Sequence, residues 1–147
     1  MTDAPVTDPE SGLFSEAMLR AVLPSRVATA RRTLRQLGLV VAAVGDGPDP
    51  GEMAELVGHT VRDSDIAARL DDGRVALVLE FTPSEGCAVV ADRFRTKVAE
   101  THPDAEVRLG IACYPAHALS ADELVVAADT ALGEAGPGDV VTAPVAE

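Results

Sequence analysis

The chain of 147 residues contains no tryptophan, and aromatic side chains make up only 3% of it. Aliphatic side chains must therefore build the core, and the hydrophobic content of 47% is large enough for one globular domain. No apolar run approaches the ~18 residues that a membrane-spanning helix needs. No basic segment followed by an apolar stretch marks a signal peptide, so we expect a cytoplasmic protein without a membrane partner.

Basic residues are scarce as well, since 12 Lys and Arg stand against 24 Asp and Glu. The net charge is −12, and Lys97 is the only lysine. Such a surface repels polyanions, which excludes nucleic acid or an anionic membrane as a broad partner. A small anionic ligand remains compatible with the composition, provided that a few arginines gather around it.

Cysteine and histidine are too few and too scattered to predict a metal site or a cofactor. Cys87 and Cys113 are the only cysteines, and their separation fits no metal-binding spacing. The sequence favours two buried thiols over a disulfide, although a disulfide remains possible. His59, His102 and His117 form no HxxxH or HxH arrangement.

Hydrophobic periodicity and turn residues predict alternating helices and strands. Three segments resemble capping boxes, in which a side chain closes the first turn of a helix: Asp49 to Glu52, Thr82 to Glu85, and Ser120 to Glu123. Asp71-Asp72-Gly73 predicts a tight hairpin, because such turns need a positive φ. The expected helices are 15–37, 50–61, one from 82 onward, and 120–134; the expected strands are 39–44, 66–70, 74–81, 107–114 and 139–142.

This order of elements predicts an α+β fold of the ferredoxin-like type. The central sheet should be mostly antiparallel, with helices packed on its faces. We expect one domain over residues 8–142, a flexible N-terminus at 1–7 and a flexible tail at 143–147.

The hairpin segment from Arg62 to Leu79 resembles the signature hairpin of GGDEF domains, the diguanylate cyclases. Their pattern is RxxD, a short apolar stretch, an Arg, GGDEF at the turn and an apolar strand. Residues 8–13, 108–112 and 128–135 resemble three further family motifs in the same order: DxLTGL, SIGIA and ADxALYxAK. The resemblance implies a nucleotidyl cyclase-like GGDEF fold and a role in bacterial cyclic di-GMP signalling.

The sequence departs from the family pattern where active members hold metal ions and cyclise two GTP molecules into cyclic di-GMP. Residues 71–75 read DDGRV in place of GGDEF, so that Arg74 replaces the signature acid. Residues 42–45 read AAVG where the family has an Asp-x-Asp metal site. From these departures we expect a pseudoenzyme: no catalytic activity, no catalytic residue and no bound metal.

The retained motif is Arg62-x-x-Asp65, which stands where active members bind their product as an inhibitor. The resemblance therefore implies a catalytically inactive domain that binds cyclic di-GMP as a receptor or regulator. The candidate ligand-binding residues are Arg62 and Asp65, with Arg69 and Arg74 adding positive charge along the hairpin. An arginine fork can bind a phosphate or stack on guanine.

Two other functions remain open at this stage. One is a nucleotide-independent protein–protein interaction module, which serves as a scaffold or forms a homodimer. A rearranged metal enzyme would use Asp46, Asp71 and Asp72. The Arg62–Asp65 pair also fits a plain surface cap or ion pair without a ligand.

Overall fold

The computed structural model describes residues 5–145, so the outermost parts of both predicted flexible ends lie outside the described residues. Within this range no helix is both long and apolar enough to cross a membrane. The elements in chain order are β1 (Phe14–Ser15), α1 (Glu16–Thr33), β2 (Leu37–Val44), α2 (Pro50–Gly58), β3 (Ile66–Arg69), β4 (Val75–Glu80), α3 (Ser84–Thr101), β5 (Val107–Tyr114), α4 (Ala121–Glu134) and β6 (Val140–Thr142).

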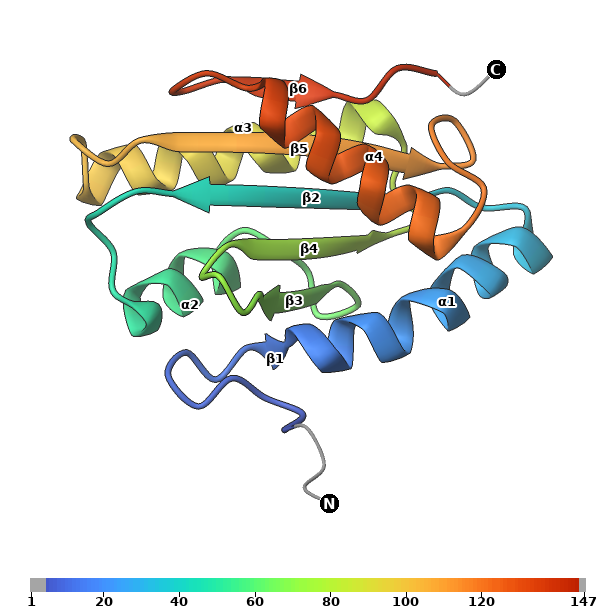
Figure 1. The fold of residues 1–147 in the computed structure, drawn as a ribbon, viewed down its shortest axis with the longest axis horizontal. Helices are drawn as coiled ribbons and strands as arrows, with labels where there is room; N and C mark the ends of the chain where they lie inside the picture. Colours follow the sequence, from blue (N-terminus) through green and yellow to red (C-terminus); the bar gives the residue numbers. More distant parts are fainter. Residues whose placement is uncertain (1–4, 146–147) are drawn as a thin grey trace.

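The six strands form one mixed sheet in the order β1-β3-β4-β2-β5-β6 (Figure 1). The four inner strands pair antiparallel, whereas the edge strands β1 and β6 run parallel to their neighbours. From β2 to β5 the chain follows the βαββαβ path of a ferredoxin-like fold. The predicted α+β class and mostly antiparallel sheet are therefore confirmed.

Two helical layers cover the sheet, with α1 and α4 on one face and α2 and α3 on the other (Figure 1). Strand β2 lies in the middle and is buried on both sides. Leu39 and Val41 join the α1–α4 core, while Val40 and Ala42 join the α2–α3 core. This alternation follows from the two-residue repeat of a strand, and a continuous apolar segment is what such a central strand requires.

Two of the three predicted helix caps form as expected. Asp49 and Glu52 make a reciprocal capping box at α2, and the Ser120 hydroxyl accepts the Glu123 N–H at α4. The prediction for α3 is wrong, because its N-cap is Pro83 and no side chain caps it. The Thr82 hydroxyl instead donates to the Glu80 carbonyl oxygen at 2.9 Å.

The short strand β1 has no counterpart in the sequence prediction. It pairs with β3 in parallel register, Phe14 opposite Ala68. The preceding segment contacts both of its residues: the Ser15 hydroxyl donates to the Pro5 carbonyl oxygen at 2.6 Å, and Thr7 bridges to Phe14. A strand of two residues is too short to show a hydrophobic repeat, so only the tertiary contacts define it.

Helix α4 approaches β5 most closely at Gly110. A methyl group built on Gly110 would overlap the Ala128 carbonyl oxygen and the backbone of Leu132. Since these neighbours are backbone atoms of a packed helix, they cannot rotate away as a side chain would. Gly110 therefore sets the distance between α4 and the sheet.

Replacing Gly110→Ala should destabilise the protein by about 1–3 kcal/mol, because overpacking forces α4 away from β5. The matched control is Gly133→Ala, whose added methyl meets no atom within 4 Å on the outer side of α4. That control should be neutral or stabilising by up to ~1 kcal/mol, since Ala is the better helix former. Urea unfolding measures both changes, and equal midpoints for the two variants would contradict the assigned role of Gly110.

Candidate functional site

The carboxylate of Asp65 lies just before β3, and only 2% of its side chain is exposed. One oxygen accepts the Arg62 backbone N–H at 2.9 Å, and the other accepts the Glu80 N–H at 3.1 Å. Because Glu80 is the last residue of β4, this carboxylate joins the turn before β3 to the end of the neighbouring strand. Asp65 therefore shapes the open end of the β3–β4 hairpin.

The guanidinium of Arg62 lies over the same end of β4, yet 62% of the side chain remains exposed. Its Nη2 donates to the Glu80 carbonyl oxygen at 2.7 Å and to the Thr82 hydroxyl oxygen at 3.0 Å. The same nitrogen lies 3.3 Å from the Asp65 carboxylate. The Nε atom lies 3.4 Å from the second oxygen of the same carboxylate. Four protein oxygens thus orient one side of the guanidinium, while its Nη1 makes no hydrogen bond within residues 5–145.

Arg62 and Asp65 line a hollow of about 210 Å³ between the hairpin and α3, which we call the Arg62 hollow. Its lining residues are Thr60, Arg62, Asp65, Leu79, Thr82, Val90 and Arg93. The floor is apolar where Leu79 and Val90 contribute, and the rim carries two arginines. An apolar floor beside cationic donors suits a flat base with an attached phosphate.

Sequence reasoning missed Arg93, the second arginine of the Arg62 hollow. Its Nη1 lies 3.5 Å from the Thr60 carbonyl oxygen, and it forms no ion pair with any residue that the structure describes. The signal was available in principle, since Val90 and Arg93 are three residues apart and share one face of α3. It could be used only once the side of the sheet covered by α3 was known.

Arg69 and Arg74 lie at the other end of the hairpin and do not join Arg62. Strand β3 has four residues, which separates Arg69 from Asp65 by about 13 Å. Arg69 pairs with Asp8 and Glu10, each at 3.2 Å.

Two carboxylates likewise hold Arg74. It pairs with Asp72 at 2.7 Å and with Asp129 at 2.9 Å. Partial burial opposes ionisation of Asp72, but hydrogen bonds from the Arg74 backbone and guanidinium outweigh it, and the pKa of Asp72 falls below 3.8. The carboxylate is therefore ionised at neutral pH and balances the Arg74 charge.

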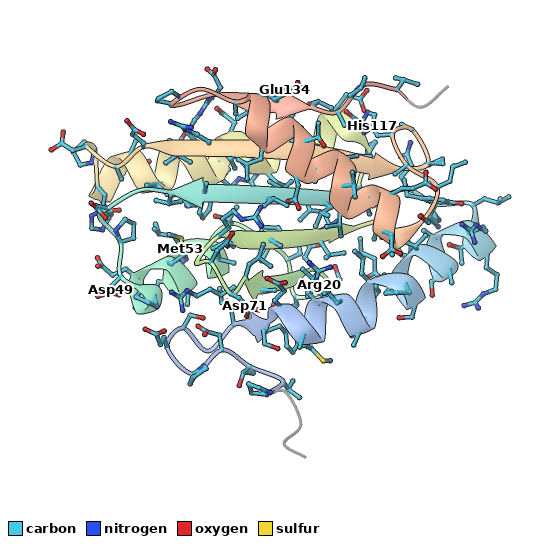
Figure 2. The ribbon with its side chains drawn as sticks, in the orientation of Figure 1. Arg20, Asp49, Met53, Asp71, His117 and Glu134 are labelled. Carbon is cyan, nitrogen blue, oxygen red and sulfur yellow. The ribbon has the colours of Figure 1, made fainter. Side chains whose placement is uncertain are left out.

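The turn itself forms as the Asp-Gly pattern predicts. Gly73 has a φ of 91°, and its N–H donates to the Leu70 carbonyl oxygen at 2.9 Å. A larger hollow of about 410 Å³ opens between this turn and the start of α2. Figure 2 shows Asp49 and Met53 on the α2 side and Asp71 at the hairpin turn.

The donor set of this larger hollow does not fit a metal ion. No group of three or more Asp, Glu, His or Cys side chains suited to a metal occurs between residues 5 and 145. The metal ions that active GGDEF domains hold would need oxygen ligands at close range. Here the Asp72 carboxylate is paired with Arg74 instead. We therefore assign no metal ligand and derive no step through a metal.

Comparison with known proteins identifies the family. The family model "Diguanylate cyclase, GGDEF domain" matches residues 51–138. That range includes the hairpin and covers more than half of the chain. The protein therefore belongs to the GGDEF domain family of diguanylate cyclases. No curated protein sequence matches the chain.

Solved GGDEF domains share the fold at low sequence identity. The GGDEF domain of TpbB (YfiN) from Pseudomonas aeruginosa matches with a TM-score of 0.81 and 22% identity, covering 93% of this chain and 94% of that one. The GGDEF domain of DgcB from Caulobacter crescentus, in complex with c-di-GMP, matches with 0.79 and 18%, covering 97% and 96%. SiaD from Pseudomonas aeruginosa, in complex with its activator SiaC, matches with 0.81 and 21%, covering 95% and 62%.

The family match contradicts our expectation that the chain is not an enzyme. That expectation rested on the substitutions at residues 71–75, yet the diguanylate cyclase model extends across this turn. Fold and family are those of an enzyme class, so the departures at Asp71, Asp72 and Arg74 do not support loss of activity. The resemblance to GGDEF domains itself is confirmed.

Asp65→Ala should destabilise the protein by roughly 2 kcal/mol, because it leaves the Arg62 and Glu80 N–H groups without their buried acceptor. The matched control is Asp63→Ala, an exposed carboxylate in the same turn, which should change stability by less than about 0.5 kcal/mol. Chemical unfolding of both variants measures the difference. A loss of similar size in both would show that Asp65 does not hold the hairpin end.

Proposed function

We propose that this domain, over residues 8–142, binds cyclic di-GMP at the Arg62 hollow and acts as a cytoplasmic receptor in bacterial signalling. The observation that carries the proposal is the state of Arg62. Four protein oxygens orient its guanidinium, but most of the side chain faces solvent. An arginine whose position is fixed in advance loses little conformational freedom when it binds an anion.

The charge of the ligand fits the Arg62 hollow better than the turn end of the hairpin. Cyclic di-GMP carries two phosphates, and a chain with a net charge of −12 must meet them with local cations. Arg93 has no carboxylate partner within the described residues, and Arg62 has one. Arg69 and Arg74 each have two, so we leave both outside the binding site.

The size of the hollow limits what it can enclose. About 210 Å³ is less than the ~300–1,000 Å³ typical of a pocket for a whole drug-sized ligand. One guanine or one phosphate therefore enters, and the rest of the dinucleotide lies along the surface. Asp65, already an acceptor for two backbone N–H groups, acts here as a positioning residue for Arg62.

Calorimetric titration with cyclic di-GMP should show low-micromolar binding, with GTP and cyclic di-AMP as controls. Arg62→Ala and Arg93→Ala should each weaken the affinity about tenfold or more, since a charge-assisted hydrogen bond contributes about 1.5–3 kcal/mol. Arg95→Ala is the matched control, because it lies on α3 but donates to Asp92 and to the Gly138 carbonyl oxygen. Its affinity should be unchanged.

Two results would reject the receptor proposal. One is the absence of binding heat in a sample whose circular dichroism shows a folded protein. The other is an affinity that Arg62→Ala leaves intact, which would move any binding to another surface. An equal loss of affinity in Arg95→Ala would indicate a nonspecific charge effect and would likewise count against the site.

A second candidate function is a protein–protein interaction module, here a homodimer, and the backbone near the end of α1 favours it. Leu34 and Phe81 are the two non-glycine residues with positive φ between residues 5 and 145, at 56° and 53°. Their side chains are 92% and 44% exposed. Both line a hollow of about 450 Å³, together with Arg31 and Arg35. Strained backbone and exposed apolar side chains in one place are typical of a functional surface.

We take the occupant of this hollow to be a second copy of the chain. The hollow is cationic, with Arg31 stacked on Tyr114 and Arg35 on Phe81 at 5.7 and 5.0 Å. A second copy offers an excess of carboxylates, since each chain carries 24 acidic residues. An acidic surface of that second copy would be complementary in charge to the hollow.

Leu34→Gly separates stability from association. It should stabilise the monomer by about 1 kcal/mol, because glycine adopts the left-handed conformation without strain. Sedimentation should nevertheless show a dimer of the unmodified protein that this variant weakens. The control Val126→Ala changes an exposed apolar residue of α4 outside the hollow and should leave the dimer intact. A monomer at every concentration would reject the homodimer.

A further inference from the structure

The two cysteines, far apart in the sequence, meet inside the protein. Cys87 lies in the first turn of α3 and Cys113 near the end of β5, and both are buried. Their sulfur atoms are 3.5 Å apart. That distance exceeds the length of an S–S bond by about 1.5 Å, which side-chain rotation can close.

The fold makes room for this contact at Gly38. On β2, Gly38 stands opposite Cys113 in the antiparallel register. A methyl group at position 38 would overlap the sulfur atom of Cys87. A glycine within a central strand weakens that strand, so its presence at the second position of β2 indicates that the space for the Cys87 side chain matters.

The first turn of α3 has no side-chain cap, whereas α1, α2 and α4 each have one. Pro83 provides no side-chain cap, and Gly86 lies within the turn. The N–H of Cys87 donates to the Pro83 carbonyl oxygen at 2.9 Å, and this bond closes the turn. Helix ends without caps open at low cost, so this turn is the part of the Cys87 surroundings that opens to solvent most readily.

We propose that Cys87 and Cys113 form an oxidation site that closes into an intrachain disulfide, with hydrogen peroxide or another peroxide as the oxidant. Contact with Cys113 and burial raise the pKa of Cys87 in the closed fold, so its thiol loses a proton only where the first turn of α3 opens to solvent. The Cys87 thiolate then attacks a peroxide oxygen, the O–O bond breaks, and the departing hydroxide takes a proton to become water. The thiolate of Cys113 then attacks the sulfur of the Cys87 sulfenic acid, and its hydroxide leaves as a second water. Two thiols and one hydrogen peroxide give one disulfide and two waters.

The disulfide would fasten the first turn of α3 to β5. The sulfur of Cys87 already lies 3.9 Å from the Thr82 carbonyl oxygen, so the bond forms beside the segment that enters α3. Local opening of residues 83–87 should then cease, while the sheet register stays unchanged. This proposal does not depend on nucleotide binding, because mass, thiol content and amide exchange are all measured on the protein without a ligand.

The test treats the folded, reduced full chain with a small excess of hydrogen peroxide. The intact mass should fall by two hydrogen atoms, and two free thiols should disappear on a thiol assay in denaturant. Hydrogen exchange of the amides of residues 84–90 should slow at least about fivefold, and dithiothreitol should reverse every change. Cys87→Ala and Cys113→Ala should fold and show neither the mass loss nor the slowed exchange.

Three outcomes would overturn the proposal. The first is retention of both thiols in the folded protein when the same peroxide forms the disulfide in urea. The second is a covalent dimer in place of the intrachain bond. The third is a disulfide that forms but leaves exchange at residues 84–90 unchanged, because the bond would then not restrain α3.

Discussion

The antiparallel pairing of β2 with β4 is the constraint on which both ends of the β3–β4 hairpin depend. Six residue pairs join the two strands, from Leu37 opposite Glu80 to Ala42 opposite Val75. A shift by one residue would turn every buried side chain of β4 to the wrong face, so the register is fixed. Glu80, the last residue of β4, then contacts Asp65 and Arg62, and Arg74 directly precedes the first residue of β4.

The two ends of this hairpin differ in how their charges are balanced, although both carry arginines. At the turn, Arg69 and Arg74 each contact two carboxylates, so a ligand there would have to break existing ion pairs. At the open end, backbone and hydroxyl oxygens hold much of the Arg62 guanidinium, and Arg93 has no carboxylate partner in the described part. An anion therefore competes with fewer carboxylates at the open end.

The sequence patterns were sufficient for the class of fold and for most elements. The apolar segment before Gly45, the Asp-Gly turn and the Ser120 cap each encode a local preference, and each forms as expected. Contacts between distant segments were not predictable in this way. Arg69 looked close to Arg62 along the chain, but the extended strand between them separates the two. Arg93 joined the Arg62 hollow only through the packing of α3.

Chemistry was harder to predict than structure, for a physical reason. The substitutions at residues 71–75 changed the character of single side chains, and we inferred a lost activity from them. The family model matches residues 51–138 as a whole. The few changed side chains of one turn are a small part of that range. Similarly, the Thr82 hydroxyl was expected to accept an N–H of the following helix, but it accepts from Arg62 Nη2 and donates to the Glu80 carbonyl oxygen.

The brevity of the two outermost strands has a consequence for how the protein behaves at high concentration. β1 has two residues and β6 has three, so each border of the sheet offers few open backbone groups to a neighbouring chain. Long bare borders are where sheets of separate molecules join into aggregates. The fold therefore has a built-in safeguard against fibrous assembly, which suits a protein whose core is rich in β-forming valine.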